Sequence, residues 1–412
     1  MVKVSRQRSA ELRSELLDSA AAELRRVGYD AMALTTVAGN CGLATSAIYN
    51  RFPTKEALVE ALIEERLEPK LGALSDAEAV AFWSGSSESP KLDFEQLGVI
   101  SELLLAARHT PSLQDSVYGF IRRRTDIALA EREKAVARGE ARDGQDPRVQ
   151  VLMRAASWIG GYICGLASAP PKRGLKAINE LMRITVTNLP FTTPLPMEQL
   201  SKPRVAPPAP SLENHDHDDI CAALVDAAAE VFATKGYEAA AVADISRRAG
   251  LTTGAIYNRF SGKAGLMNEV IISEISPEAQ ANSFDLVGAL AATSELSNAA
   301  LDVIIERFSD DADKRKRGLR LAARDAARHE PEVAAVVGPI QDVTLVGMAN
   351  FVRNAQGEGL IRSDIDPEAA VWWIIVNPLG ISLLRGVFPE LGFNDWAPSY
   401  AVAMEILRTQ PA

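Results

Sequence analysis

Several features common in other proteins are scarce in this 412-residue chain. Its three cysteines, Cys41, Cys164 and Cys221, are odd in number and far apart, which argues against a disulfide framework and a cysteine-based zinc site. No uninterrupted apolar run reaches the roughly 18 residues that cross a membrane, and the chain does not open with an export signal. We therefore expect a cytoplasmic protein without a metal or a cofactor, and without membrane association.

Alternating β-branched runs, which are typical of strands, are also nearly absent. Helical periodicity fills the chain instead, with 47% hydrophobic and 24% charged residues, a composition typical of globular proteins. A chain of this length exceeds one ordinary core and suits two to four domains of about 100 residues. The sequence therefore predicts an all-α protein with several domains.

The chain contains a head-to-tail duplication. The hexapeptide Ala-Ile-Tyr-Asn-Arg-Phe occupies residues 47–52 and recurs at 255–260, which is 208 positions later. Farther along, Arg108 and its neighbours recur at Arg328 with an offset of 220. We call the two repeats copy one and copy two, and we expect both to have been built for the same task.

Each copy begins with a helix that ends near a glycine, and two short helices joined by a glycine turn follow. These short helices are predicted at about 34–40 and 44–50 in copy one, and at 242–248 and 252–258 in copy two. Two short helices around a glycine turn form a helix-turn-helix, whose second helix can lie in the major groove of DNA. We call each of these units a head.

The outer face of the second short helix is polar in both heads. Hydroxyl and amide groups there can bond to base edges or phosphates, and a tyrosine ring can lie along the sugar-phosphate chain. A lysine in the next helix lies near a helix N-terminus, where a phosphate is favoured. The predicted DNA-binding residues are Thr35, Thr36, Thr45, Ser46, Tyr49, Asn50 and Lys55 in copy one, and Thr252, Thr253, Gly254, Tyr257, Asn258 and Lys263 in copy two.

The order Gly-Tyr, short helix, Gly-Leu, Thr-x-Gly-Ala-Ile-Tyr-x-x-Phe and a downstream lysine resembles the tetracycline-repressor (TetR) family over about 45 residues of each copy. The resemblance implies one-component regulators that dimerise through a four-helix bundle and leave DNA when a small apolar ligand enters the C-terminal domain. The copies depart from the family at Ala33 and Ala241, where a capping hydroxyl is usual. A lost cap typically costs about 1 kcal/mol.

Periodicity and proline content divide the chain into five regions. Seven prolines lie between residues 190 and 212, which predicts an extended connector between the copies. The predicted regions are a first helix-turn-helix domain at 1–66, a first helical ligand and dimerisation domain at 67–189, a proline-rich linker at 190–212, a second helix-turn-helix domain at 213–275 and a second helical domain at 276–412.

The two heads differ in charge, although the chain as a whole carries −10. Residues 1–66 hold nine basic and nine acidic side chains, whereas residues 211–275 hold five and ten. The excess of acidic side chains in the second head opposes contact with phosphates. Copy two nevertheless matches the family motif better than copy one, because it keeps Thr252 and Gly254. The sequence does not rank the DNA affinities of the heads.

We expect the chain to fold by itself into the dimer that the family builds from two chains, with 148–168, 173–189, 367–387 and 395–409 as bundle helices. Such a monomer would read an imperfect inverted repeat, and further homodimerisation is possible. The expected function is a DNA-binding transcription regulator, with repression as the family default. The alternative is a helical ligand- or protein-binding protein in which one or both heads have lost function.

Two further interpretations concern ligands and catalysis. No nucleophile with a base, phosphate loop or metal-ligand cluster marks the chain as an enzyme. Aromatic residues at helical spacing in the larger domains could line a pocket for a small apolar ligand, although such residues are more often plain core. The candidate pocket residues are Trp158, Tyr162, Phe308, Phe351, Trp372 and Trp373.

Overall fold

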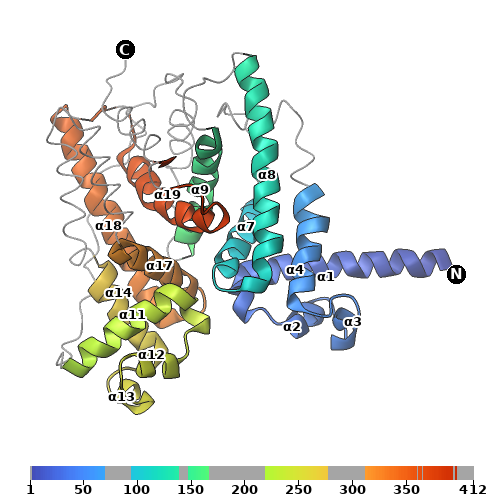
Figure 1. Ribbon diagram of the computed structural model, residues 1–412, viewed down its shortest axis with the longest axis horizontal. Helices are drawn as coiled ribbons and strands as arrows, with labels where there is room; N and C mark the ends of the chain where they lie inside the picture. Colours follow the sequence, from blue (N-terminus) through green and yellow to red (C-terminus); the bar gives the residue numbers. More distant parts are fainter. Residues whose placement is uncertain are drawn as a thin grey trace.

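The computed structural model describes most of both copies. Every regular element in that part of the chain is a helix, in agreement with the predicted all-α class (Figure 1). The predicted linker at 190–212, the predicted bundle helix at 173–189 and most of 395–409 lie outside the described residues, so the five predicted regions stay predictions. The described residues are 2–69, 94–138, 147–166, 219–276, 311–359, 361–363, 365–392 and 395–396.

The two heads have the same succession of helices, and the predicted short helices are confirmed to within one residue at each end. The first head contains α1 (Val2–Ala31), α2 (Leu34–Asn40), α3 (Thr45–Tyr49) and α4 (Lys55–Leu62), which continues as the π-helix η1 (Ile63–Leu67). The second head contains α11 (Asp219–Ala239), α12 (Val242–Arg248), α13 (Thr253–Tyr257) and α14 (Lys263–Ile275).

Packing against the first helix stabilises the short helices of each head. Leu17 and Leu24 of α1 are fully buried, and Val37 and Ile48 from α2 and α3 belong to the same core. In the second head, Phe232 of α11 shares its core with Ile245 and Ile256. Helices of five to seven residues are marginal alone in water, so this burial is what holds them.

Within the described residues, each copy continues with three longer helices, which we call its body. They are α7 (Phe94–Ala107), α8 (Pro111–Ala137) and α9 (Pro147–Gly165) in copy one, and α17 (Asp311–Ala326), α18 (Pro331–Gly357) and α19 (Pro367–Val387) in copy two. Four of the six begin at a proline, which is tolerated at the first helical position because its missing N–H has no partner there. The proline positions therefore set where these helices start.

Helices α9 and α19 cross at close range, and we call their contact the seam. A Cβ atom added to Gly160 would collide with the backbone of Val376, and one added to Gly380 would collide with the backbone of Ala156. With the offset of 220, these two contacts are the same contact with the copies exchanged. One hydrophobic core runs through the seam and contains residues of both copies, among them Ile159 and Trp373.

Two helices, α18 and α19, are long and apolar enough to cross a membrane by length and composition alone. The expectation drawn from uninterrupted apolar runs missed them. Both contain an internal proline, Pro339 or Pro378, and both carry amide side chains that are buried in the protein core, Gln341 and Asn377. Buried core helices of soluble proteins pass the same test of length and composition.

Candidate nucleic-acid interface

A glycine redirects the chain between the first helix and the short helices of each head. Gly28 interrupts α1 with φ 76° and ψ 171°, and Gly236 interrupts α11 with φ 76° and ψ 175°. Side-chain-bearing residues rarely adopt this backbone conformation, so glycine is required at both kinks. One more helical turn follows each kink, which extends the first helix beyond its predicted end.

The turn between the short helices is the same in both heads. Gly42 and Gly250 have φ values of 66° and 69°, as the sequence predicts. The N–H of Leu43 donates to the carbonyl of Ala38 at 2.9 Å, and the N–H of Leu251 donates to the carbonyl of Ser246 at 2.8 Å. These matching bonds fix the angle at which α3 and α13 leave the heads.

The predicted loss of a helix cap is also confirmed. Ala33 and Ala241 occupy the N-cap positions of α2 and α12, and neither helix has a side-chain capping bond. In the same way, Ala44 and Thr252 precede α3 and α13 without a side-chain cap. Backbone turns and core packing must therefore hold the starts of these helices.

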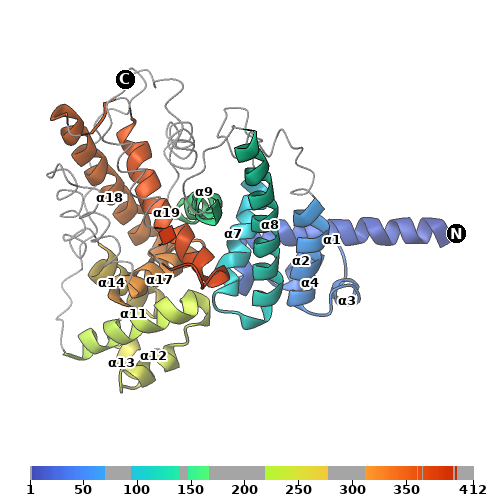
Figure 2. The ribbon, with the colours of Figure 1, turned by 45° about the horizontal axis from the view of Figure 1, so that its top comes forward.

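The predicted reading faces are open to solvent. Tyr49 is 46% exposed and Tyr257 is 63% exposed, whereas the preceding isoleucines, Ile48 and Ile256, are completely buried. Figure 1 places α13 at the lower edge of the molecule and α3 at its lower right, and Figure 2 shows α3 beside α4. DNA contact by these faces stays a prediction. The other predicted residues that are exposed are Thr35, Thr36, Thr45, Ser46 and Asn50, and in copy two Thr252, Thr253, Gly254 and Asn258.

The two predicted phosphate-binding lysines already have partners within their heads. The ammonium of Lys55 donates to the carbonyls of Tyr29 at 2.8 Å and Asp30 at 3.3 Å, and it lies 4.5 Å from the centre of the Tyr29 ring. Lys263 repeats this arrangement, with bonds of 3.0 and 3.5 Å and a ring distance of 4.2 Å. Both lysines tie the fourth helix to the end of the first, and their contact with phosphate stays a prediction.

The second head presents basic groups that the sequence reasoning passed over. Arg247 and Arg248 end α12 and are exposed, where the first head has Gly39 and Asn40. Asp244 pairs with Arg247 and, at 2.7 Å, with Lys235. The acidic balance of the second head is therefore partly offset beside the turn that leads to α13.

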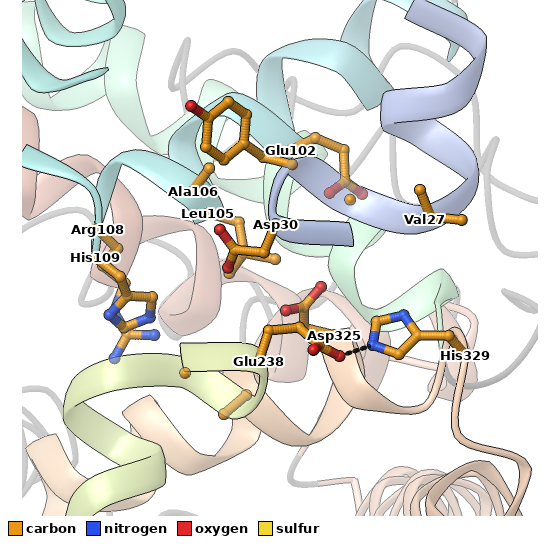
Figure 3. Close-up of a pocket in the computed structure, with 14 residues that line it drawn as sticks. Val27, Asp30, Glu102, Leu105, Ala106, Arg108, His109, Glu238, Asp325 and His329 are labelled. Carbon is orange, nitrogen blue, oxygen red and sulfur yellow. Dashed lines mark ion pairs between the residues drawn. The ribbon is translucent and has the colours of Figure 1, made fainter. Parts of the chain in front are cut away.

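A hollow lies between the two heads and the ends of α7 and α17, and we call it the junction. Four carboxylates line it, from Asp30, Glu102, Glu238 and Asp325. Figure 3 shows these side chains between Arg108 and His109 on one side and His329 on the other. The junction thus brings together charged residues that lie up to 299 positions apart in the chain.

Crossed contacts at the junction fasten the body of one copy to the head of the other. Arg108, at the end of the first body's α7, donates to the carbonyl of Ala233 in α11 at 2.6 Å. The His109 ring bonds through Nδ1 to the carbonyl of Thr234 at 2.8 Å. In the opposite sense, a guanidinium nitrogen of Arg328 lies 3.1 Å from the Cβ position of Gly28.

Ion pairs complete the junction. Arg328, with a side chain only 5% exposed, pairs with Glu102 at 2.8 Å and Asp325 at 2.9 Å. His329 pairs with Glu238 at 2.6 Å, within its own copy. Arg328 therefore links the two bodies directly, because Glu102 belongs to copy one.

Burial dominates the titration of the junction. Burial raises the pKa of Glu102 to about 7, although Arg328 beside it acts in the opposite direction. Burial also raises the pKa of Asp325 and of Asp30. Loss of water, together with the charge of Arg108, lowers the pKa of His109 to about 4. Burial of the junction therefore costs the most free energy when all of its carboxylates are ionised.

A proton-linked change in stability is expected from Glu102. Its pKa is raised on folding, so the folded state binds the proton more tightly, and stability falls as pH rises from 4.5 through 7. Lowering the pH from 8 to 6.5 should therefore raise the free energy of unfolding by about 0.8 kcal/mol through this group. Relative to the wild type, Glu102→Gln should lack this gain of about 0.8 kcal/mol, as measured by urea denaturation of both proteins at both pH values.

His109 opposes part of this effect, because its pKa is lowered on folding. The unfolded ring is half protonated at pH 6.5, so lowering the pH from 8 to 6.5 costs about 0.4 kcal/mol of stability through this group. That cost is shared by the wild type and Glu102→Gln, so it cancels when the two proteins are compared. Glu133→Gln, at an exposed position of α8, removes the same charge and is the matched control. An unchanged slope in Glu102→Gln would show that other groups carry the pH dependence.

The candidate pocket aromatics are dispersed among the body helices. Trp372 and Trp373 are buried in the core, and Trp158 and Phe351 are partly buried. Tyr162 donates its hydroxyl proton to Glu102 at 2.9 Å, which places it behind the junction. Phe308 lies outside the described residues. A pocket for a small apolar ligand lined by these residues stays a prediction.

Comparison with known proteins agrees with this geometry. The family model described as "Bacterial regulatory proteins, tetR family" matches residues 16–62 and again 224–270, which are the two heads. Residues of this chain are 32% identical over 114 positions to the HTH-type transcriptional activator FasR of Mycolicibacterium smegmatis, covering 28% of this chain and 50% of that protein.

Two relatives from Pseudomonas putida show the same restricted similarity. The HTH-type transcriptional regulator SrpR is 41% identical over 54 residues, which are 13% of this chain and 25% of the relative. The uncharacterized HTH-type transcriptional regulator TtgW is also 41% identical over 54 residues, with 40% of its length covered. The chain thus covers half or less of the length of each of these relatives.

Proposed function

Because the chain belongs to the tetR family of bacterial regulatory proteins, with the DNA-binding region of that family present twice, we propose that one polypeptide grips one operator with both heads. It is a DNA-binding transcription regulator by family. We further propose that each head reads one half of an imperfect inverted repeat. The observation that carries it is the exposure of both reading faces on a molecule whose bodies share a core.

We propose that the chain acts as a monomer that replaces a two-chain dimer. Two observations support this: the seam contact recurs with the copies exchanged, and at the junction each body contacts the head of the other copy. The operator should be imperfect because the reading faces differ: Tyr49 and Asn50 have identical counterparts, whereas Ser46 corresponds to Gly254. Two fused heads need no second chain, so assembly of the two-headed molecule does not depend on protein concentration.

The direction of control and the signal are proposed from the resemblance to the family. We propose repression that is relieved when a small apolar molecule enters a body, in a cytoplasmic protein without catalytic activity. One relative is named as an activator, so repression has to be tested separately from binding. A reporter gene behind the operator, with and without the regulator, distinguishes the two directions.

A binding protein with a decayed second head is the second candidate. It is favoured by the acidic balance of residues 211–275, five basic against ten acidic side chains. Arg247 and Arg248 argue against it, because they place positive charge beside the recognition turn. In this alternative, a single half-site would hold the protein as tightly as a complete operator does.

Selection of bound DNA from a random pool tests the proposed function directly. Two working heads should enrich two related half-sites at one fixed spacing, with different bases at the positions that Ser46 and Gly254 face. Enrichment of a single half-site without a fixed partner would reject the two-headed grip in favour of the second candidate. If no sequence is enriched, both candidate functions that require sequence-specific DNA binding are rejected.

A further inference from the structure

One position in the seam lies on the axis that relates the two copies. Gly160 contacts Val376, and the exchanged contact joins Gly380 to Ala156. Between these two contacts, Ser157 of α9 faces Asn377 of α19, and the offset of 220 makes these two residues counterparts of each other. A residue that faces its own counterpart marks the position of the axis.

The two residues at this position differ, and they fit together. The amide of Asn377 donates to the Ser157 hydroxyl at 2.7 Å and to the carbonyl of Met153 at 3.3 Å. The Ser157 hydroxyl donates in turn to the carbonyl of Met153 at 3.0 Å. Asn377 is completely buried and Ser157 is 5% exposed. Buried polar groups are costly without partners, and the bond between Asn377 and Ser157 supplies part of the hydrogen bonding of both side chains.

Two separate identical chains cannot reproduce this pair. In a symmetric dimer the same residue stands on both sides of the axis, so the pairing would be serine with serine or asparagine with asparagine. The flanking glycines hold the two backbones in close contact, which fixes the space between them. Two serines are too short to fill that space, and two asparagines crowd it.

A second polar contact between the copies lies beside the seam, from α18 to α9, and has no equivalent with the copies exchanged. The Gln341 amide donates to the carbonyl of Cys164 at 3.1 Å and accepts from Arg324 at 3.0 Å. The counterparts of these three residues at the offset of 220 are apolar and buried: Ile121, Leu384 and Leu104. The two sides of the seam have therefore diverged, and copy two makes a polar contact with copy one that copy one does not return.

We propose that Ser157, Asn377 and Gln341 are pairing-specificity residues, which make copy one join copy two and disfavour the joining of like copies from two chains. This inference rests on the proposed one-chain grip and adds the residues that enforce it. Such specificity matters because like-with-like pairing would link chains into larger assemblies, with heads on two different molecules.

Exchanging the two axial residues in the full-length protein tests this inference. Asn377→Ser and Ser157→Asn each leave an unmatched pair, so each should lower the urea midpoint of unfolding and produce species of twice the chain mass in sedimentation velocity. The double exchange restores an unlike pair in the opposite orientation, with the carbonyl of Trp373, the counterpart of Met153, as acceptor. It should recover at least half of the summed midpoint loss and return the protein to one chain mass.

The controls separate the inference from the proposed function. Ser9→Asn, at an exposed position of α1, measures the cost of the same replacement in a helix without a pairing role. A double exchange that is as unstable as the sum of its single variants would overturn the pairing inference. Wild-type protein at twice the chain mass would instead reject the one-chain grip, whatever the exchange variants do.

Discussion

Replacing Gly160 with alanine is expected to lower the free energy of unfolding by about 3 kcal/mol or more. The added methyl group would collide with the backbone of Val376 in the other copy, and backbone cannot swing aside as a flexible side chain can. Helices α9 and α19 must then separate, and the core that both copies share loses its packing. Urea denaturation followed by tryptophan fluorescence measures the change.

The neighbouring glycine supplies a matched control. No heavy atom outside the local helix lies within 4 Å of a Cβ added to Gly161. Gly161→Ala should therefore leave stability unchanged or raise it by up to about 1 kcal/mol, since alanine is the better helix former. Gly380→Ala should behave like Gly160→Ala, because the contact recurs with the copies exchanged. Equal effects at 160 and 161 would show that the close crossing of the seam is wrong.

Removing both reading-face tyrosines should lower DNA affinity by about 1,000-fold on the selected operator. Tyr49→Ala and Tyr257→Ala should each cost about 10- to 100-fold, because each ring is exposed on its face and is expected to contact the sugar-phosphate chain. The second head of a fused pair binds at high effective concentration, so loss of either head weakens the whole grip. Titrations at several salt concentrations should give a shallower slope only for a variant in which a head no longer contacts DNA, because an uncharged tyrosine displaces no counterions itself.

Ile127→Ala is the control for this experiment. Ile127 is 49% exposed on α8, away from both heads, so its removal should leave affinity and salt slope unchanged. A variant Tyr257→Ala that binds as wild type, beside a weakened Tyr49→Ala, would assign DNA binding to the first head alone. That outcome would favour the second candidate function and would contradict the two-headed grip.

Much of each head could be predicted because its signals are local. The limits of α2 and α12, the positive φ of Gly42 and the missing caps follow from neighbouring residues in the sequence. Helical periodicity likewise separated buried Ile48 from exposed Tyr49. Because the chain is duplicated, the same residue pattern occurs twice, which makes a chance match to the helix-turn-helix pattern improbable.

The contacts between elements could not be predicted in this way. The crossed contact of Arg108 with Ala233 joins residues 125 positions apart, and no periodicity within either copy encodes it. For Lys55, the position near a helix start predicted a phosphate partner but did not predict the bonds of its ammonium to the carbonyls at the end of α1. Those partners depend on side-chain direction, which spacing alone does not give.

The crossed contacts of the junction determine which parts of the molecule move together. Arg108 and His109 end the first body's α7 and grip the second head, while Arg328 reaches the first head from the second body. Any shift of α7 would therefore be transmitted to α11 through these bonds. For the regulator proposed above, we therefore expect a ligand bound in one body to alter how the head of the other copy holds its half-site.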